Sequence, residues 1–455
     1  MSSYLSSEYY SNRIKQARKK MAPDSAMVLF SSGKKERNSG VHYSYRTNSD
    51  ILYLTGINTP EFAIYIDSKE GTHIFLSESN AEKTRWEGRG VTFENISKNI
   101  NIDIEKNIHP YEKIWAKLKE LLKNKETVYF SLGKDGQIDV KITETINNIK
   151  NNLKKGDFAP TRIIHPQEIL HEMRIIKTPE EIKLMKKAAE ISAKAHENLI
   201  KYCRENVNKK ELFEFELKSY IEWEFSKNAL TSLAYPSIIA AGNNATVLHY
   251  TNLTSKVSAQ DLVLVDAGCE YEGYASDISR TFPAGGKFTE AQKILYEIVL
   301  TAQKKAFEKC YINNTLDGIH DAALNTIVDG LFELGFFKKF LFIKNEKTEM
   351  KSSSSKEEII KKEYYKTYYM HNTSHYLGLD VHDAGSRYIN HKPRPLENGM
   401  VFTIEPGIYM PHEYDFLPEE FRGIGIRIED DVIMQNGKHE IITHEAPKEI
   451  SDLEV

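Results

Sequence analysis

VDAGCEYEGYASDISRTF, residues 265–282, places two carboxylates in stretches that otherwise read as apolar strands. The preceding residues 261–265 read as a buried strand that ends directly in Asp266, and Asp277 lies in a second strand-like run, residues 274–279. A buried carboxylate without a partner costs several kcal/mol or stays protonated. The two acids therefore require compensation, either by basic side chains or by a cation.

Two further strand-like runs each carry an acid. The run MVFTIEPG, residues 400–407, reads as an apolar strand that ends at Glu405, where the Pro-Gly pair stops it. In GIRIEDD, residues 425–431, strand side chains alternate between two faces, so Arg427 and Glu429 share one face. Glu429 is therefore either the partner of a base such as Arg427 or a ligand of a cation. We expect the two acids that follow it to be solvated, namely Asp430 and Asp431.

A cluster of three histidines completes the pattern, at His371, His375 and His382. Four carboxylates with one imidazole form a mostly oxygen ligand set, which suits two divalent ions a few ångströms apart and bridged by carboxylates. Manganese fits this set best, and cobalt, iron or zinc could take its place because affinity rank alone does not decide the metal. The candidate ligands are Asp266, Asp277, Glu405 and Glu429, together with one of the three histidines. Taken singly, each has an ordinary structural explanation, so the hypothesis depends on the joint pattern.

Such a centre favours hydrolysis. Two ions lower the pKa of a bridging water, hold a hydroxide near neutral pH and polarise a carbonyl. A carboxylate ligand that also contacts the water can act as general base. Histidines that bind no metal can donate hydrogen bonds to the substrate carbonyl or the developing oxyanion. His249 and His382 are the candidates for this role, and a structural role is the equal alternative for each.

Length and composition narrow the class of protein. A chain of 455 residues suits two domains, and a net charge of −4 gives no case for a nucleic-acid or anionic-membrane partner. The three cysteines, Cys203, Cys269 and Cys310, argue by number and spacing against a disulfide framework or a thiolate zinc site. The N-terminus lacks a secretory apolar region, and no run approaches the ~20 apolar residues of a membrane helix. We therefore expect a cytoplasmic protein that binds neither nucleic acid nor membrane.

The first part of the chain, residues 1–172, reads as an α/β domain. A helical spacing at 111–123 alternates with strand-like runs at 26–30, 51–55, 62–66, 72–76 and 127–130. A second domain, residues 173–455, begins close to Thr178, where Thr-Pro-Glu-Glu has the form of a helix N-cap and capping box. This helix should run to about Tyr202.

The second domain reads as α+β, because helices are mixed with strands that read as antiparallel. The further helices are expected at 209–228, 289–309 and 315–335, and the strands at 236–241, 261–266, 273–282, 400–405 and 425–434. Lysine, glutamate and four consecutive serines dominate residues 344–362, which we expect to form a solvated loop or an insertion.

The ligand order Asp, Asp, His, Glu, Glu resembles that of the metallopeptidases that include methionine aminopeptidase, prolidase and aminopeptidase P and share the pita-bread catalytic fold. Within this group the chain is most similar to aminopeptidase P of the bacterial type. The resemblance extends over nearly the whole chain, and further segments that carry it are 45–56 (YRTNSDILYLTG), 171–180 (HEMRIIKTPE), 248–250 (LHY), 375–383 (HYLGLDVHD) and 423–431 (GIGIRIEDD).

The resemblance implies a role for each ligand. Asp266 would chelate one ion, whereas Asp277 and Glu429 would bridge both. His375 and Glu405 would complete the second site, with Glu405 as general base. Two Mn²⁺ per subunit would then hold the bridging hydroxide that attacks the substrate.

The resemblance also implies roles for residues that bind no metal. His249 and His382 would bind the substrate and shuttle protons, and His371 would be a further active-site histidine. Tyr409 and Arg427 would form an accessory pair that supports proton movement. One departure from the bacterial pattern His-Gly-x-Ser-His is Asn372, in place of glycine. Asparagine tolerates a left-handed backbone better than most residues, so we expect the loop to keep its shape.

For the first domain, the resemblance implies a creatinase/prolidase-like α/β module that shapes the site and mediates a homo-oligomer, a dimer or a tetramer. Trp86 resembles an aromatic residue that a neighbouring subunit contributes, and packing between domains is its alternative role. The activity implied is the release of the first residue from peptides whose second residue is proline. The alternatives are a prolidase that cleaves Xaa-Pro dipeptides and an inactive peptide-binding relative, which the full ligand set disfavours.

Overall fold

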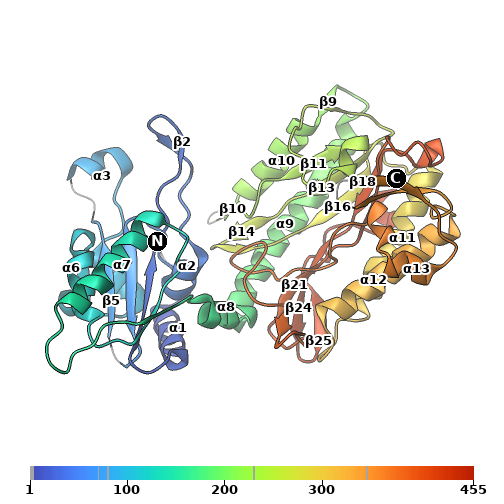
Figure 1. Cartoon of the computed structure of the whole chain (residues 1–455). Coiled ribbons are helices and arrows are strands. Elements are labelled where there is room, and N and C mark those ends of the chain that lie inside the picture. Colours follow the sequence, from blue (N-terminus) through green and yellow to red (C-terminus); the bar gives the residue numbers. More distant parts are fainter. Residues whose placement is uncertain (1–4, 70, 79–80, 229–230, 345–346, 455) are drawn as a thin grey trace. The chain divides into compact units, whose positions relative to one another are not determined.

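The computed structural model describes residues 5–69, 71–78, 81–228, 231–344 and 347–454. The chain divides into two units, Met1–Met173 and Arg174–Val455, each with its own hydrophobic core (Figure 1). The three cysteines are free and buried in the second unit. Within the described part of the chain, no helix combines the length and the apolar content needed to cross a bilayer.

The first unit is built on a six-stranded sheet. In spatial order its strands are β6 (Ile108–Pro110), β5 (Thr72–Leu76), β4 (Phe62–Asp67), β1 (Ser25–Phe30), β7 (Thr127–Tyr129) and β8 (Arg162–Ile164). Strand β4 runs antiparallel to both of its neighbours, whereas β1, β7 and β8 run parallel to one another. Strands β1 and β4 are buried along almost their whole length, as expected for a sheet covered on both faces. The α/β prediction for this part of the chain is confirmed.

Helices α6 (Ile114–Leu121) and α7 (Gly136–Asn151) share one core cluster with strands β1, β4, β5 and β7. Helices α1 (Ser7–Lys20) and α2 (Ser49–Thr55) contact strands β4 and β1. The other elements of this part are β2 (Glu36–Asn38), β3 (Val41–His42), α3 (Ala81–Glu87), α4 (Phe93–Ile100) and α5 (Ile104–Asn107), and α8 (Gln167–Ile175) follows β8.

The strand predicted at 51–55 is wrong, because these residues belong to helix α2. The side chain of Asn48 caps the helix by accepting a hydrogen bond from the backbone N–H of Ile51. Gly56 ends the helix in the left-handed conformation, with φ 64°. The capping residues on both sides decide the structure here, against the β propensity of the apolar run between them.

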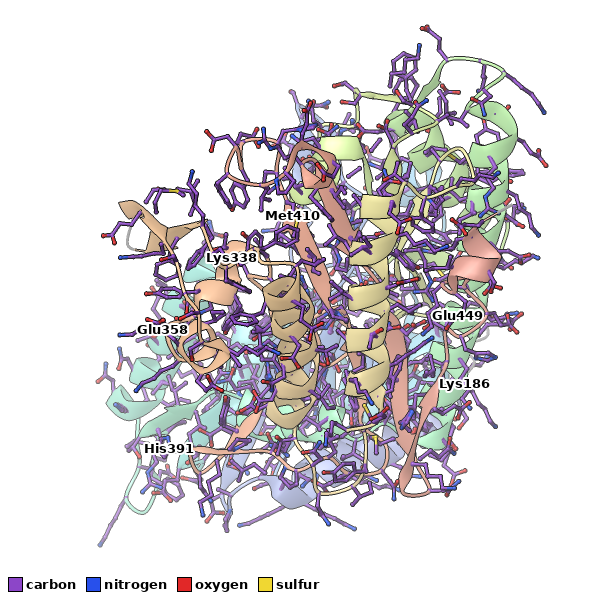
Figure 2. The ribbon with its side chains drawn as sticks, turned by 90° about the vertical axis from the view of Figure 1, so that its right-hand side faces the viewer. Lys186, Lys338, Glu358, His391, Met410 and Glu449 are labelled. Carbon is purple, nitrogen blue, oxygen red and sulfur yellow. The ribbon has the colours of Figure 1, made fainter. Side chains whose placement is uncertain are left out.

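The first long helix of the second unit is α9 (Pro179–Asn206), and its predicted capping box at Thr178 and Glu181 is confirmed. Helix α10 (Glu214–Ser226) follows it, and α11 (Glu290–Phe307) and α12 (Leu316–Glu333) pack against each other. Figure 2 shows α11 and α12 side by side. The four predicted helices of this domain are therefore present, with bounds a few residues from those expected.

The strands that surround the predicted ligands are antiparallel, which confirms the α+β prediction. One sheet has the order β11 (Ile238–Ala241), β13 (Leu262–Asp266), β16 (Ser279–Pro283), and a second β10 (Thr231–Leu233), β14 (Cys269–Tyr271), β15 (Tyr274–Ala275). A third has the order β21 (Val401–Ile404), β24 (Asp430–Gln435), β25 (Lys438–Ile441), and β22 (Gly407–Met410) pairs with β23 (Ile424–Arg427). The short elements are β9 (Leu212–Phe213), β12 (Lys256–Val257), β19 (Tyr388–Ile389), β20 (Lys392–Pro393) and α14 (Ile450–Leu453).

Two predicted strands are interrupted at the residues of interest. The run 273–282 breaks between β15 and β16, and Asp277 lies in the break instead of in a strand. The run 425–434 breaks between β23 and β24, and Glu429 lies there. The first break lies against Gly268, where a Cβ atom would come within 1.8 Å of the carbonyl oxygen of Ser276. These breaks release both carboxylates from the alternation of a regular strand.

Most of residues 344–362 are ordered, against the prediction of a solvated loop. They contribute to the hairpin of β17 (Phe340–Lys344) and β18 (Lys347–Lys351) and form helix α13 (Lys356–Lys361), while 345–346 lie outside the described residues. Ser355 caps α13 through the backbone N–H of Glu358, and the buried Ile359 anchors the helix in the core of the second unit. The serines therefore act partly as helix caps, and the apolar residues among the charges bring the segment onto the core.

Candidate active site

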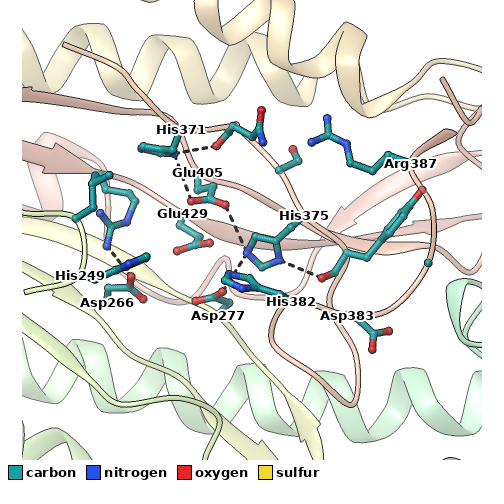
Figure 3. A pocket seen from close by; sticks show the side chains of 16 residues that line it. His249, Asp266, Asp277, His371, His375, His382, Asp383, Arg387, Glu405 and Glu429 are labelled. Carbon is teal, nitrogen blue, oxygen red and sulfur yellow. Dashed lines mark hydrogen bonds and ion pairs between the residues drawn. The ribbon is translucent and has the colours of Figure 1, made fainter. Parts of the chain in front are cut away.

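A cavity of about 480 Å³ in the second unit brings together the predicted ligands and histidines (Figure 3). Its walls include nine of the predicted residues: His249, Asp266, Asp277, His371, His375, His382, Glu405, Arg427 and Glu429. Tyr409 is fully buried behind this wall and contacts it through hydrogen bonds. The sequence pattern therefore predicted side chains that converge on one place.

The antiparallel pairing explains why acids far apart in sequence converge. Asp266 ends β13 and lies opposite Ser279 of β16, so the break that holds Asp277 directly follows the pairing of Asp266. Ile404 of β21 lies opposite Asp430 of β24, which places Glu405 and Glu429 beside each other at the ends of paired strands. Strand ends from two sheets thus deliver the four acids.

His375 is held so that one ring nitrogen faces the acids. Its Nδ1 lies 3.0 Å from the carbonyl oxygen of Tyr376, and a carbonyl can only accept, so Nδ1 carries the proton. Its Nε2 lies 3.4 Å from Asp277 Oδ2 and 3.5 Å from Glu405 Oε1. Potential ligand atoms of Asp277, His375 and Glu429 all lie within 4.8 Å of one another. This arrangement orients Nε2 as a metal ligand does.

Arg427 connects the acids to Tyr409. Its guanidinium donates to Asp266 Oδ2 at 2.6 Å, to Ser279 Oγ at 2.8 Å and to Tyr409 Oη at 3.0 Å. The alternative that Arg427 pairs with Glu429 is therefore wrong. Instead, Glu429 accepts a hydrogen bond of 2.8 Å from the Ser279 hydroxyl.

Tyr235 was not predicted, although it contacts two of the candidate ligands. Its hydroxyl lies 2.7 Å from Asp266 Oδ1 and 2.5 Å from Asp277 Oδ1. Nearby, Asp431 accepts a hydrogen bond from the backbone N–H of Asp277 and another from the Ser276 hydroxyl. Nothing in the sequence around Tyr235 marks it, whereas alternation along residues 425–431 could have marked Asp431 as facing the same way as Glu429.

The expectation that Asp430 and Asp431 are solvated is wrong, because both are fully buried. Asp430 forms ion pairs with Arg280 at 2.7 Å and with Lys448 at 2.6 Å. Burial alone would raise the pKa of Asp430, but the charges of Arg280 and Lys448 outweigh burial and lower the pKa to about 2. Arg280 and Lys448 therefore neutralise Asp430, so Asp430 is not a candidate ligand.

In the described ranges of the chain, none of the four candidate acids is paired with two cations in this way, although Arg427 donates to Asp266. Burial raises the pKa of Glu405 to about 7, with Asp277 adding to the effect against the opposing charge of His375. Burial, then the charges of Asp277 and Glu405, raise the pKa of Glu429 well above its ordinary value. Burial raises the pKa of Asp266 even though Arg427 opposes it. Crowded carboxylates that repel one another in a buried site are the donor set that a divalent cation stabilises, so the residues fit such ions.

The histidines divide into two states. Burial lowers the pKa of His375, but its contact with Asp277 and the charge of Glu405 raise it more, to about 9. Burial and then Arg427 lower the pKa of His371 to about 3, so this ring is neutral and its 3.7 Å contact with Glu405 is no ion pair. Burial and the neighbouring His375 also lower the pKa of His382, whose ring is perpendicular to that of His375 at 4.5 Å.

A directed chain of hydrogen bonds leads from Arg427 to His371. The carbonyl of Asn372 accepts from His371 Nδ1 at 2.8 Å, which leaves Nε2 as the acceptor for the Tyr409 hydroxyl at 2.8 Å. Burial raises the pKa of Tyr409 to about 12, so the phenol keeps its proton. Asn372 has no positive φ, so this turn does not need the glycine that the bacterial pattern has. His249 is exposed and lines the cavity.

Two family models match the chain. Metallopeptidase family M24 matches residues 183–436, and the aminopeptidase P N-terminal domain matches residues 10–129. The Xaa-Pro aminopeptidase of Haemophilus influenzae is 36% identical over 453 residues, which cover 99% of this chain and 97% of that protein. The Xaa-Pro aminopeptidase of Escherichia coli is 32% identical over 456 residues, which cover 99% of this chain and 98% of that protein.

Solved structures agree with the sequence matches. The Pseudomonas aeruginosa aminopeptidase PepP has a TM-score of 0.90 at 34% identity, covering 99% of this chain and 97% of that one. An Escherichia coli aminopeptidase P in complex with substrate has a TM-score of 0.89 at 31% identity, covering 99% and 97% of the two chains. The order of the candidate ligands, their convergence and these matches lead to one conclusion: the chain belongs to metallopeptidase family M24 and, within it, to the aminopeptidase P group.

Proposed function

We propose that this chain releases the N-terminal residue from peptides whose second residue is proline. The observation that carries the proposal is the convergence of four carboxylates and His375 in one cavity, beside the neutral His371. Xaa-Pro aminopeptidases similar to this chain over nearly its full length support the choice of substrate.

Two Mn²⁺ per subunit are the cofactor that we propose, with Co²⁺, Fe²⁺ or Zn²⁺ as possible replacements. The residues that would hold them are Asp266, Asp277, His375, Glu405 and Glu429. Bound there, the ions would supply an activated water and polarise the scissile carbonyl. A zinc-substituted Escherichia coli aminopeptidase P is among the similar structures, which supports more than one metal for this kind of site.

The chain's own residues would bind the peptide and move protons. Glu405 would accept a proton from the attacking water and pass it to the leaving amine. His249 and His382, in the cavity wall, would donate hydrogen bonds to the substrate carbonyl and to the oxyanion that develops from it. His371 and Tyr409, joined at 2.8 Å and supported by Arg427, would hold the proton chain in one direction.

We further propose that residues 1–172 form the creatinase/prolidase-like domain and residues 173–455 the catalytic domain. The protein would be a cytoplasmic homo-oligomer, a dimer or a tetramer. Trp86 supports an oligomer, because this indole on α3 is 85% exposed and α3 has no buried residue. An exposed indole of this size is typical of a protein–protein contact.

The test uses chelator-stripped protein that is reloaded with Mn²⁺ and given Arg-Pro-Pro, Arg-Ala-Ala or Gly-Pro. We expect free arginine from Arg-Pro-Pro alone and loss of this activity in Glu405→Ala. Mass spectrometry of the reloaded wild type should show two metals per subunit. Cleavage of Gly-Pro with little release from the tripeptide would indicate a prolidase. Folded protein that holds two metals and hydrolyses none of the three would contradict the proposed function.

A further inference from the structure

A second buried ionic cluster lies beside the cavity and involves none of the candidate ligands. The side chain of Asp383 is 1% exposed and contacts two cations: Lys177 Nζ at 2.8 Å and Arg174 Nη2 at 2.6 Å. The side chains of Arg174 and Lys177 are 4% and 1% exposed. Burying three charged groups is costly unless their geometry is good, so a cluster of this kind fixes the elements that carry it.

The cluster joins two segments that are far apart in sequence. Arg174 and Lys177 lie at the end of α8 and just before α9, whereas Asp383 belongs to the loop 376–385 that follows His375. Burial raises the pKa of Asp383, but Lys177 and Arg174 lower it below the ordinary range, so the carboxylate stays ionised at neutral pH. Figure 3 shows this carboxylate turned away from the four acids of the centre.

The loop is closed tightly around Asp383. The backbone N–H of Asp383 donates to the carbonyl of Tyr376 at 2.8 Å, and the carbonyl of Gly378 accepts from Ala275 at 2.8 Å. A Cβ atom at Gly378 would come within 2.3 Å of Asp383 Oδ2, so only glycine leaves room for the carboxylate there. The loop and the cluster are thus built around one another.

The same loop presents His382, the residue next to Asp383, to the cavity. Among the residues that the structure describes, the His382 ring finds no hydrogen-bond partner, and it meets His375 edge to face at 4.5 Å. Its position therefore depends on the backbone that carries it. A side chain in the cavity wall needs such support to be placed to within a fraction of an ångström.

We propose that Asp383 is a positioning residue, whose buried carboxylate, clamped by Arg174 and Lys177, fixes the loop that places His382 against the substrate. The inference rests on the proposed function, because it takes His382 to be a substrate-binding histidine. Asp383 itself touches no reacting atom and acts through its neighbour. Arg174 also contacts Asp380 at 2.6 Å, but the side chain of Asp380 is 43% exposed, which makes Asp380 the matched control.

The experiment compares the Mn²⁺-loaded wild type with Asp383→Asn, His382→Ala, the double variant and Asp380→Asn on Arg-Pro-Pro. We expect Asp383→Asn to lower kcat/KM by about 10-fold to 100-fold, as for other residues that orient a working side chain. The double variant should lose no more than His382→Ala alone, because both changes remove the same function. Asp380→Asn should stay within about 2-fold of the wild type, since solvent screens the partly exposed Asp380 and Arg174 keeps Asp383 as its buried partner. Losses that multiply in the double variant, or full activity in Asp383→Asn, would overturn the proposal.

Asp383→Asn leaves two buried cations with one acid, so a charge-balanced variant keeps the test decisive if that protein does not fold. Lys177→Met with Asp383→Asn removes one charge of each sign and leaves the Arg174–Asp380 pair. Amide hydrogen exchange of residues 376–385 is the second readout, and we expect it to be faster in this variant while α11 and α12 keep wild-type rates. A wild type that is inactive on all peptides would contradict the proposed function, whereas unchanged exchange in the loop would overturn the clamp.

Discussion

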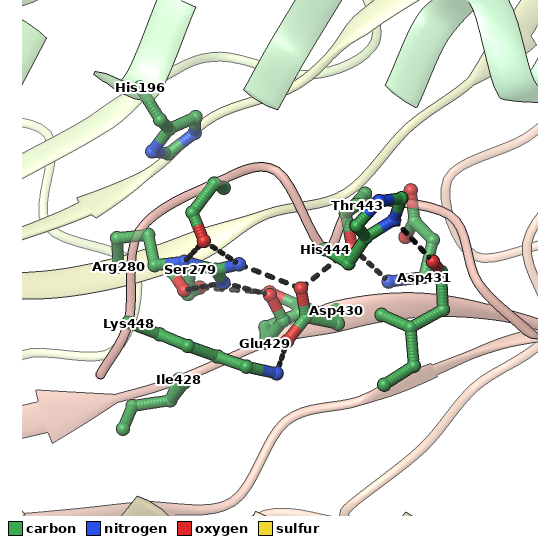
Figure 4. A network of polar contacts seen from close by, with 12 residues as sticks. His196, Ser279, Arg280, Ile428, Glu429, Asp430, Asp431, Thr443, His444 and Lys448 are labelled. Atoms are coloured by element: carbon green, nitrogen blue, oxygen red, sulfur yellow. Dashed lines mark hydrogen bonds and ion pairs between the residues drawn. The ribbon is translucent and has the colours of Figure 1, made fainter. Parts of the chain in front are cut away.

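Glu429 and Asp430 are neighbours in the chain, both are buried, and their charges are treated in opposite ways (Figure 4). Asp430 contacts Arg280 and Lys448 and also accepts a hydrogen bond of 2.7 Å from Thr443. Glu429 accepts from the Ser279 hydroxyl, and burial, followed by the charges of other acids, raises its pKa well above the ordinary value. Asp430 is neutralised by the protein, whereas Glu429 has the environment that our proposal assigns to a cation ligand.

The two acids also depend on each other. Arg280, which neutralises Asp430, donates to the backbone carbonyl of Glu429 at 2.5 Å. Asp430, through Arg280, thus anchors the break between β23 and β24. The anchored break holds Glu429 among the other acids of the site. The difference shows that a candidate metal ligand such as Glu429 is recognised by the lack of a cationic partner for its carboxylate among the described residues. Its neutralised neighbour Asp430 holds the backbone around it in place.

The largest effect is expected from Glu429→Gln, which keeps the shape of the side chain and removes one acid from the centre. We expect kcat/KM on Arg-Pro-Pro to fall by about 10⁴-fold, because bound ions supply several kcal/mol of transition-state stabilisation. The metal-free protein should be no less stable than the metal-free wild type, because an uncompensated buried charge is gone. Glu440→Gln, which alters an exposed acid, is the control. Wild-type metal content in Glu429→Gln would contradict the ligand assignment.

The complementary change, Asp430→Asn, should act on stability first. It leaves Arg280 and Lys448 buried beside a neutral amide, so we expect the free energy of unfolding to fall by about 3–5 kcal/mol. Denaturant titration of the metal-free protein measures this change. A loss below about 1 kcal/mol would mean that Asp430 is as poorly compensated as Glu429.

The sequence predicted the candidate ligands, such as Glu429, much better than it predicted the structural acid Asp430. Asp266 and Glu405 stand at the ends of apolar runs, where an acid has no ordinary reason to be, and their joint pattern with His375 located the cavity. Asp430 carries the same local signal as Glu429. Its partners Arg280 and Lys448 are distant in sequence, so no local pattern separates a neutralised acid from a free one.

The fold was predictable where local signals and burial agree. The capping box at Thr178 and the apolar runs at 62–66 and 72–76 gave elements that the structure confirms. The run 51–55 failed because capping by Asn48 and Gly56 outweighed strand propensity. Tyr235 was missed because a hydroxyl that hydrogen-bonds to two acids distant in the chain leaves no trace in the sequence around it.

Tyr409→Phe tests the hydrogen-bond chain that connects Arg427, the cation beside the candidate ligands, to His371. The change removes the hydroxyl that accepts from Arg427 and donates to His371. We expect kcat to fall by about 10-fold to 100-fold with little change in KM, because the proton chain is cut while the ligands remain. The control is Tyr368→Phe, which removes another buried hydroxyl, one that donates to the Phe336 carbonyl. Equal kcat losses in the two variants would assign the effect to packing.

Asp383 sharpens the comparison, because it is a second buried acid held by two cations and is not a candidate ligand. Its pKa is lowered in the folded protein, against burial, by Lys177 and Arg174. A lowered pKa stabilises the fold at every pH above the unfolded value of about 3.9, and this stabilisation disappears as the pH falls through the folded value.

The free energy of unfolding of the wild type should therefore exceed that of Asp383→Asn by a constant amount from pH 7 to about pH 5, where both pKa values lie below the pH. Below the unfolded value of about 3.9 the difference should shrink, because the carboxyl of the unfolded wild type takes up a proton while the folded carboxyl is still ionised, and this favours the unfolded chain. Urea titrations of the metal-free proteins at several pH values measure the difference. Ile359→Val, a core change without a titratable group, should cost the same stability throughout. A difference for Asp383→Asn that stays constant down to pH 3 would place this carboxylate's contribution in packing and not in its charge.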